Sequence, residues 1–541
     1  MTPRSLLLLL LAFAGCPQPV QELPLLPDAG ASVDAGAAVD AGSMTTPDSG
    51  IPTRNVTWTR CPLHSEGTLP WAECATVPLP LDAANPTGPT IDVFVKRWRP
   101  AGGRGLRALW MLQGGPGASG YAFEGLSEQL ATRFPDVDYY FPDHRGTGRS
   151  TRLGCSAEEE DVSEGGLSIT ETEWPSCLAT VTSQFGTRLQ SFNTTNAAND
   201  LGILIESTRR EGQPVFVYGV SYGTSWLHRY VQLFPQQVDG VVFDSIAAPG
   251  MSLFRQDEDA NEAARDFLGA CAADTFCRSK LGPDPWAKAV ALFAKLKTGH
   301  CSAIAVPDAP TNVLLRRAFG SFLMDPSMRA YLPAIIHRVD RCEPRDVAAL
   351  QKLMQALTQP GGASEFMKQW SWVLAHNIIT SEFNESPPPT KALLQSIRDG
   401  AVASRDITEQ LEVHLGTWPS YAPGPLATQW ADSSMPMLFL QGGLDPATLL
   451  RKARVMKPHF TRPNQTWVEL PTATHTTLAS SPYVNEAGER RSCGTRLLMS
   501  FIEAPTASLD VSCAQKVVPL DFTLPRTEVN QALFGTNDAW E

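Results

Sequence analysis

Short buried-strand patterns alternate with helical patterns along most of this chain, and this alternation limits its fold more than any other feature. Continuous apolar runs such as 106–113 and 137–142 are typical of strands that are buried on both faces. Helical spacing separates the later runs, which predicts a largely parallel sheet with crossover helices and an early hairpin. The expected strands are 75–81, 90–98, 106–113, 137–142, 214–220, 240–243, 435–441 and 465–470, and helices are expected at 196–210 and 224–234.

The pattern changes after Pro249. Residues 251 to about 428 lack buried-strand runs and show helical stretches at 260–273, 285–297 and 345–357. Because strand patterns return at 435, we expect a sheet that is completed only after a helical insertion. The expected parts are residues 53–250 and 431–541 for the sheet domain and 251–430 for a helical cap.

Composition excludes two classes of protein. With 43% hydrophobic and 18% charged residues, the chain has enough apolar material for a large core and too little charge for a disordered polyelectrolyte. Its formal net charge of −12 provides no basic surface for a phosphate backbone. We therefore expect a globular protein and no nucleic-acid partner.

The N-terminus has the pattern of a signal peptide. Arg4 precedes a short apolar run that ends at Gly15, and the run is too short to span a bilayer as a helix. The run Phe13-Ala14-Gly15-Cys16 resembles the lipobox of bacterial lipoproteins, although Phe13 stands where Leu is usual. The resemblance implies removal of residues 1–15 and acylation of Cys16, while a plain secretory peptide with an incidental cysteine remains the alternative.

Residues 16–52 have the composition of a flexible spacer. Between 17 and 50 there are acidic residues, no Lys or Arg, and three Asp-Ala-Gly repeats, so this stretch lacks the apolar residues for a core. We expect it to connect the folded part to a lipid anchor on the bacterial cell envelope, at the periplasmic or the outer surface. The lipid would be the only contact with a membrane.

The cysteine count of 11 is odd, and Cys16 accounts for the odd one. In an exported chain the remaining ten predict five disulfides, most simply paired in sequence order. A zinc site is the alternative, but no Cys-x2-Cys pair is present, and we expect no metal. The ten cysteines are Cys61, Cys74, Cys155, Cys177, Cys271, Cys277, Cys301, Cys342, Cys493 and Cys513.

Gly219-Val220-Ser221-Tyr222-Gly223 lies between an expected buried strand and an expected helix. A serine at such a sharp turn is exposed for nucleophilic attack, and side chains two residues to either side would collide with the strand and the helix. The turn also directs the N–H of Tyr222 toward the serine oxygen. We expect Ser221 to be a nucleophile and Tyr222 to supply one oxyanion donor.

A nucleophilic serine needs a base, and the base needs an orienting acid. Asp445 and His475 each follow the end of an expected strand, in the order acid then histidine that such a fold requires. Asp244, at the end of the strand before the insertion, is the alternative acid.

Two further loops follow expected strands. Gln113-Gly114-Gly115-Pro116-Gly117 could supply the second oxyanion donor, and we favour Gly115. The loop Asp143 to Ser150 lacks the lysine of a phosphate loop, so we expect a structural turn in which Arg145 pairs with a carboxylate.

These loops together resemble the α/β-hydrolases of the serine peptidase S33 type, the prolyl and tripeptidyl aminopeptidases. The resemblance rests on 114–117, 143–150, 219–223, 442–446 and His475, and it extends from about residue 57 to the C-terminal segment with Cys493 and Cys513. It implies an α/β-hydrolase fold with helices on both faces of the sheet, a helical cap, no cofactor, and hydrolysis of short peptides from a free N-terminus. Thr474 differs from the family, which usually has Gly before the histidine.

We therefore expect an exported serine hydrolase, an aminopeptidase that releases short N-terminal peptides or residues through an acyl-enzyme. A carboxylester hydrolase with the same triad is the first alternative, and a catalytically inert, lipid-anchored binding protein is the second. An aminopeptidase also needs a carboxylate in the cap for the substrate ammonium group. The candidates are Asp257, Glu258, Asp259 and Glu262.

Overall fold

The computed structural model describes residues 50–541 except 66, 68, 104, 161, 307–309, 359–363 and 406. The expected signal peptide, Cys16 and nearly all of the expected spacer lie outside the described residues. No helix within the described part combines the length and the apolar character needed to cross a bilayer.

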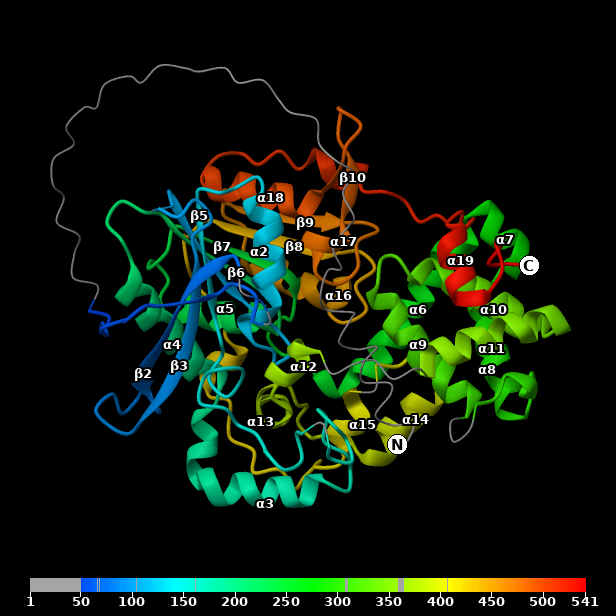
Figure 1. Ribbon diagram of the computed structural model, residues 1–541, viewed down its shortest axis with the longest axis horizontal. Coiled ribbons are helices and arrows are strands. Elements are labelled where there is room, and N and C mark those ends of the chain that lie inside the picture. Colours follow the sequence, from blue (N-terminus) through cyan, green and yellow to red (C-terminus); the bar gives the residue numbers. More distant parts are fainter. Residues whose placement is uncertain are drawn as a thin grey trace.

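A nine-stranded sheet forms the centre of the described chain (Figure 1). Its strand order is β1-β2-β3-β5-β4-β6-β7-β8-β9, antiparallel from β1 to β5 and parallel from β5 to β9. A separate hairpin pairs β10 with β11. The strands are β1 Thr59–Pro62, β2 Trp71–Pro80, β3 Thr90–Trp98, β4 Arg107–Leu112, β5 Val137–Pro142, β6 Val215–Ser221, β7 Gly240–Ile246, β8 Met437–Gly442, β9 Gln465–Leu470, β10 Pro482–Val484 and β11 Arg490–Ser492.

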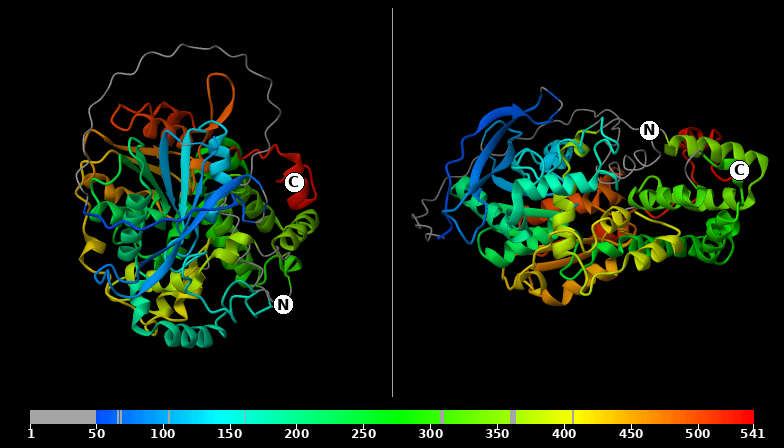
Figure 2. Two further views of the ribbon diagram at one scale, coloured as in Figure 1. Left: turned by 60° about the vertical axis from the view of Figure 1, so that its left-hand side comes forward. Right: turned by 90° about the horizontal axis from the view of Figure 1, so that it is seen from below.

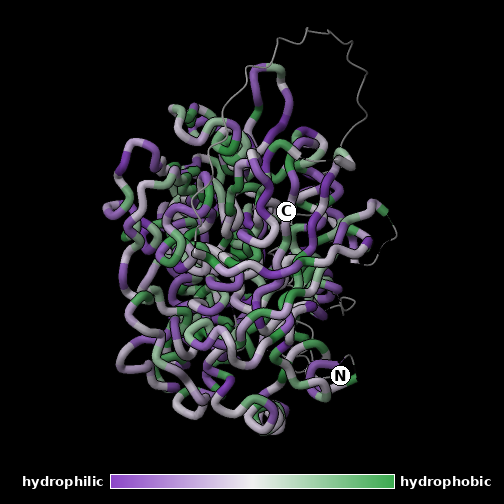
Figure 3. The backbone as a smooth tube through the Cα atoms, turned by 90° about the vertical axis from the view of Figure 1, so that its left-hand side faces the viewer, coloured by the Kyte–Doolittle hydropathy of each residue, from purple (hydrophilic) through white to green (hydrophobic). Residues whose placement is uncertain are grey.

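Both faces of the sheet are buried, as the continuous apolar strands predict. Leu109 and Met111 of β4 pack with α2 and α18, while Trp110 and Leu112 pack on the other side with α4 and α5. In Figure 3, green hydrophobic segments accordingly gather in the interior, and many of the outer loops are purple. The helices outside the insertion are α2 Glu124–Ala131, α3 Trp174–Phe185, α4 Thr194–Thr208, α5 Tyr222–Leu233, α16 Leu450–Ala453, α17 Thr477–Ser480 and α18 Cys493–Glu503.

Helices fill the chain between β7 and β8, and they divide into two groups. Helices α6 to α11 have a hydrophobic core of their own, to which Phe267, Phe319 and Ile335 belong. Residues of α12, α13 and α15, such as Val373 and Leu411, instead join the core of the sheet. These helices are α6 Gln256–Ala273, α7 Thr275–Leu281, α8 Pro285–Lys297, α9 Thr311–Met324, α10 Leu332–Arg341, α11 Pro344–Thr358, α12 Glu365–Gln369, α13 Trp372–Glu382, α14 Lys391–Gly400 and α15 Ile407–Glu412.

The C-terminal segment does not stay with the sheet. Phe522, Phe534 and Trp540 belong to the core of the insertion helices, and α19, Thr527–Phe534, lies beside them (Figures 1 and 2). The Arg338 guanidinium in α10 donates hydrogen bonds to the carbonyl oxygens of Asp538 and Ala539. The structure thus differs from the expected division at residue 431, because these apolar side chains are buried by the insertion and not by the sheet.

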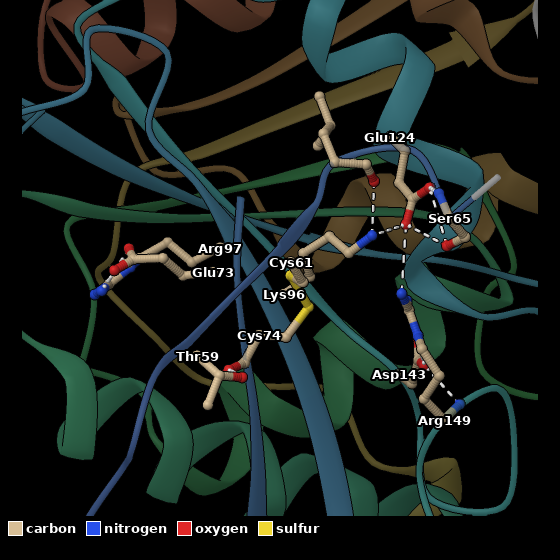
Figure 4. The surroundings of a disulfide bond; sticks show 11 residues. Thr59, Cys61, Ser65, Glu73, Cys74, Lys96, Arg97, Glu124, Asp143 and Arg149 are labelled. Carbon is tan, nitrogen blue, oxygen red and sulfur yellow. Dashed lines mark hydrogen bonds and ion pairs between the residues drawn. A yellow bond between two sulfur atoms is a disulfide. The ribbon is translucent and has the colours of Figure 1, made fainter. Parts of the chain in front are cut away.

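Five disulfides join the ten described cysteines in sequence order, which confirms the predicted pairing. The first of them links β1 to β2 (Figure 4). Next to it, the buried Lys96 ammonium group forms an ion pair with Glu124 at the start of α2. Burial lowers the pKa of Lys96, while Glu124 opposes that shift. Because Arg149 contacts both Glu124 and Asp143, this network connects the edge of the sheet to the loop after β5.

Candidate active site

Ser221 occupies a strained turn between β6 and α5. Its backbone has φ 57° and ψ −128°, in a region that L-residues rarely adopt. Side chains at the two flanking glycines would overlap backbone: a Cβ on Gly219 would meet the Gly223 carbonyl, and a Cβ on Gly223 would meet the Leu112 carbonyl of β4. The predicted steric reason for both glycines is confirmed.

Asp445 and His475 lie against each other. His475 Nδ1 is 2.9 Å from Asp445 Oδ2 and 3.1 Å from Oδ1, and both side chains are buried. The carboxylate also accepts hydrogen bonds from the backbone N–H groups of Ala447 and Thr448 and from Thr448 Oγ1. With Nδ1 held by Asp445, the opposite ring nitrogen is left for the cavity that His475 lines.

The surroundings of Asp445 favour its ionised form. Burial alone would raise the pKa of this carboxyl, but the His475 ring and the hydrogen bonds from Thr448 outweigh burial and hold the pKa below its usual value. An ionised acid that fixes the proton on Nδ1 is what a histidine needs to act as a general base.

Asp244, the alternative acid, does not contact the His475 ring. Its carboxylate accepts hydrogen bonds from Tyr218 Oη and from the backbone N–H groups of Thr477 and Leu478, at the start of α17. Asp244 therefore orients the chain that follows His475, and the geometry favours Asp445 as the acid.

The loop after β4 lies directly against the serine turn. A Cβ on Gly114 would be 2.6 Å from the Ser221 Cβ, so only glycine permits this approach. Gly115, with φ 113°, and Tyr222 line the same cavity as Ser221. Tyr222 is the first residue of α5, where a backbone N–H has no partner within the helix. Both expected oxyanion donors are thus in the wall beside Ser221.

The loop Asp143 to Ser150 is structural, as predicted. The Arg145 guanidinium pairs with both oxygens of Asp200 and donates to the carbonyls of Leu81 and Ser191. His144 Nδ1 lies 2.6 Å from the Arg145 carbonyl, so Nδ1 carries the proton.

His144 also supports the tyrosine beside Ser221. Because its Nδ1 carries the proton, Nε2 accepts from Tyr222 Oη at 3.1 Å. Burial lowers the pKa of His144 to about 3, so the ring is neutral at physiological pH. The loop thereby holds Tyr222 in place.

A single cavity joins the serine, the histidine and the insertion helices. Its floor comes from the loops after β4, β6 and β9, with Ser221 and His475. Its roof is mainly apolar and comes from the insertion, including Met324, Phe366, Trp370, Trp372, Ile379 and Phe383. Trp370 packs over Gly115, where a Cβ on the glycine would meet the indole ring at 2.9 Å.

None of the four candidate carboxylates for a substrate ammonium group is in the described lining of this cavity. Asp257 accepts a hydrogen bond from Ser404 Oγ, and Glu258 pairs with Arg255. Asp259 pairs with Lys452, and Glu262 with Arg451. The charged side chain found among the described lining residues is instead that of Arg405.

Sequence reasoning missed Thr448, His144 and Arg405. Thr448 is three residues from Asp445, a spacing at which a hydroxyl readily bonds an Asp carboxylate, so local sequence contained a signal for it. His144 and Arg405 reach the site only through tertiary packing. The described residues contain no group of three metal-ligating side chains of the kind that could hold a metal ion.

A family model described as "alpha/beta hydrolase fold" matches residues 107–277, from the start of β4 through the serine turn to α7. This chain has the α/β-hydrolase fold. The sheet order, the strained serine turn and the acid and histidine after later strands all agree with that assignment.

Two curated proteins share part of the sequence of this chain. The serine protease Hip1 of Mycobacterium tuberculosis is 28% identical over 291 residues, 49% of this chain and 53% of that protein. A tripeptidyl aminopeptidase of Streptomyces lividans is 30% identical over 194 residues, 33% of this chain and 36% of that protein. The chain thus spans about half, or less, of the length of the curated relatives it matches.

Two solved structures match this chain at low sequence identity. A thermophilic esterase from Thermogutta terrifontis is 11% identical, covers 80% of this chain and 99% of its own, and gives a TM-score of 0.33. Potato epoxide hydrolase I is 13% identical, covers 76% of this chain and 96% of its own, and gives a TM-score of 0.32.

Proposed function

We propose that this α/β-hydrolase is a serine hydrolase that cleaves acyl bonds through an acyl-enzyme. Ser221 Oγ attacks the carbonyl carbon, and His475 takes the serine proton and passes it to the leaving group. Water then attacks the acyl-enzyme with His475 again as base, and Ser221 is released. The observation that supports this most strongly is the buried Asp445–His475 pair, whose histidine lines the same cavity as Ser221.

Within this mechanism, Asp445 keeps the His475 proton on Nδ1 and stabilises the imidazolium that forms. The backbone N–H groups of Gly115 and Tyr222 stabilise the oxyanion of the tetrahedral intermediate. The apolar side chains of the roof lower the polarity around these groups, which strengthens their electrostatic interactions.

The finer proposal is a peptidase, an aminopeptidase that releases short N-terminal peptides. It is supported by the names of the relatives, a serine protease and a tripeptidyl aminopeptidase. A carboxylester hydrolase is the second candidate, because the described lining lacks the carboxylate that would hold a substrate ammonium group.

A panel of tripeptidyl 4-nitroanilides, each with a free or an acetylated amino group, tests the proposal beside short acyl esters. Ser221→Ala should lower turnover at least about 1,000-fold, because the nucleophile is lost. Ser279→Ala, which removes an exposed hydroxyl on α7, is the matched control and should leave turnover unchanged.

The panel separates the candidates. Amide turnover that requires a free amino group supports the aminopeptidase, while turnover of esters alone supports the esterase. Turnover that survives in the Ser221→Ala protein contradicts the proposed site, and absence of turnover on every substrate favours a binding protein with an inert hydrolase fold.

We also propose export and a lipid anchor on Cys16. The five disulfides support export, because such bonds persist in oxidising compartments. Labelling of a bacterial host with a clickable palmitate analogue should mark the wild-type protein and not Cys16→Ser. Equal labelling of both proteins would contradict acylation at Cys16.

A further inference from the structure

Arg405 is a cation in the wall of the catalytic cavity with no anionic partner among the described residues. Its guanidinium Nη1 lies 3.1 Å from Met324 Sδ, which is only a weak acceptor. Its Nε is buried without a hydrogen-bond partner, and no described carboxylate forms an ion pair with it. A buried guanidinium usually pairs with a carboxylate, as Arg145 does with Asp200 in the same molecule.

The backbone around Arg405 is held firmly by Asp257. This buried carboxylate accepts hydrogen bonds from the Arg405 backbone N–H at 3.1 Å, from Ser404 Oγ at 2.6 Å and from Thr408 Oγ1. Those bonds occupy Asp257, so it fixes the segment between α14 and α15 without pairing with the Arg405 guanidinium. The side chain is therefore presented to the cavity from a fixed backbone.

The surroundings of Arg405 disfavour the charged form of its guanidinium. Burial lowers the pKa of its guanidinium, although Asp445, Asp257 and Asp259 act in the opposite direction. A substrate ammonium group in this cavity would meet a cation and no described lining carboxylate. A substrate carboxylate would instead gain charge-assisted hydrogen bonds from the guanidinium.

We propose that Arg405 is a specificity-determining residue that binds a carboxylate of the substrate. The inference rests on the proposed function, since it places the carboxylate in the cavity where Ser221 attacks. The carboxylate can belong to an acidic side chain of a peptide or to the C-terminus of a short peptide, and both present the same group to the guanidinium.

Matched substrate pairs distinguish the two sources. Tripeptidyl 4-nitroanilides with Glu or Gln at each of the three positions test a side-chain carboxylate, because the two residues have the same shape. Tetra-alanine with a free or an amidated C-terminus tests a terminal carboxylate. At least one pair should favour the carboxylate member by about 10- to 100-fold in kcat/KM, as expected of hydrogen bonds to a charged group. Equal values in every pair would overturn the inference.

Variants then test whether Arg405 causes the preference for the carboxylate substrate. Arg405→Met removes the charge but keeps most of the length, and it should reduce the ratio within the favoured pair to less than about 3, because the charge-assisted bonds are lost. Arg405→Lys, which keeps the charge, should retain an intermediate ratio. Arg490→Met removes an exposed charge on β11 and controls for the net charge of the molecule. A ratio that is unchanged in Arg405→Met, or lowered equally in Arg490→Met, would overturn the inference.

A binding measurement separates failure of this inference from failure of the proposed function. Calorimetric titration of the Ser221→Ala protein with the Glu and the Gln peptide needs no turnover. About 10-fold tighter binding of the Glu peptide supports the role of Arg405 even if Ser221 proves not to be the nucleophile. Equal binding, together with turnover that depends on Ser221, rejects the role of Arg405 and leaves the proposed hydrolase intact. This comparison also holds if Arg405→Met fails to fold.

Discussion

Asp244 in β7 and Asp445 just after β8 are both buried, and the two strands are neighbours in the sheet, yet the contacts of the two acids differ. Asp445 lies against the ring of His475, whereas Asp244 accepts hydrogen bonds from backbone N–H groups beyond it. Thr474, directly before His475, makes a separate contact, because its Oγ1 donates a hydrogen bond to the Leu323 carbonyl in α9. Thr474 thus ties the histidine loop to the insertion.

The different contacts of the two acids predict the effect of Asp445→Asn. An amide can no longer fix the proton on His475 Nδ1, so kcat should fall about 10,000-fold while the fold persists. Initial rates together with circular dichroism would measure this. A loss of less than about tenfold would show that Asp445 is not the orienting acid.

The same variant has a defined effect on stability. Because the folded pKa of Asp445 lies below its ordinary value, the ionised group stabilises the fold above about pH 4, and this contribution is lost as pH falls through the folded pKa. The difference in unfolding free energy between wild type and Asp445→Asn should therefore shrink as pH decreases from about 6 to about 3. Urea titrations at several pH values would measure it, and a constant difference would contradict the lowered pKa.

At the scale of elements, the turn between β6 and α5 shows how closely a strand and its following helix are packed. A Cβ on Gly223 would overlap the backbone of β4, which is the neighbouring strand and cannot move away without disturbing the ladder. Gly223→Ala should thus lower the unfolding free energy by about 3 kcal/mol or more. Gly269→Ala, within α6 where nothing lies near an added Cβ, should instead raise it by about 0.5–1 kcal/mol. Equal effects of the two variants would contradict the steric argument.

The C-terminal segment is a second element whose role can be measured. Trp540 is fully buried against Phe276 and His337, and its Nε1 donates to the Phe522 carbonyl. Trp540→Ala should lower the unfolding free energy by about 3–5 kcal/mol. Leu393→Ala, at an exposed position of α14, is the control and should change it by less than about 0.5 kcal/mol. In Trp540→Ala, amide hydrogens of α10 and α11 should lose protection from hydrogen exchange. Loss of protection in the sheet alone would contradict the packing of the C-terminal segment on the insertion helices.

At the scale of the whole molecule, several buried histidines are neutral. Burial lowers the pKa of His144 and His228 to about 3 and of His376 and His414 to about 4. In the unfolded chain these rings regain a pKa near 6.5, so the unfolded state binds more protons below that pH. Mild acid should therefore destabilise the fold.

Each of these neutral rings should lower the unfolding free energy by about 1.4 kcal/mol per pH unit below about pH 6.5. The Ala431 N–H donates a hydrogen bond to His228 Nε2 at 3.1 Å, and His228→Gln keeps an acceptor for it. Because this variant lacks one titrating ring, the slope of its unfolding free energy against pH should be smaller by the contribution of one histidine. Urea midpoints between about pH 7 and about pH 5 would measure both slopes. Identical slopes for wild type and His228→Gln would contradict a neutral His228.

The sequence by itself was sufficient for features that depend on neighbouring residues. Continuous apolar runs predicted the buried strands, and the glycines two residues to either side of Ser221 predicted the turn, because both patterns follow from local sterics and burial. The order of Asp445 and His475 after later strands indicated where a histidine and its acid would meet. Sequence order also sufficed for the disulfides, because each pair joins cysteines that are near in the chain.

Only the tertiary structure decided how distant segments meet. It placed Arg405 in the cavity that Ser221 and His475 line, it engaged the Asp257 carboxylate in other hydrogen bonds, and it buried Trp540 in the insertion. These outcomes depend on contacts between residues hundreds of positions apart, such as the Arg338 bonds to the C-terminal segment. Hydrophobic burial is non-directional, so a local pattern shows that a side chain is buried but not which element buries it.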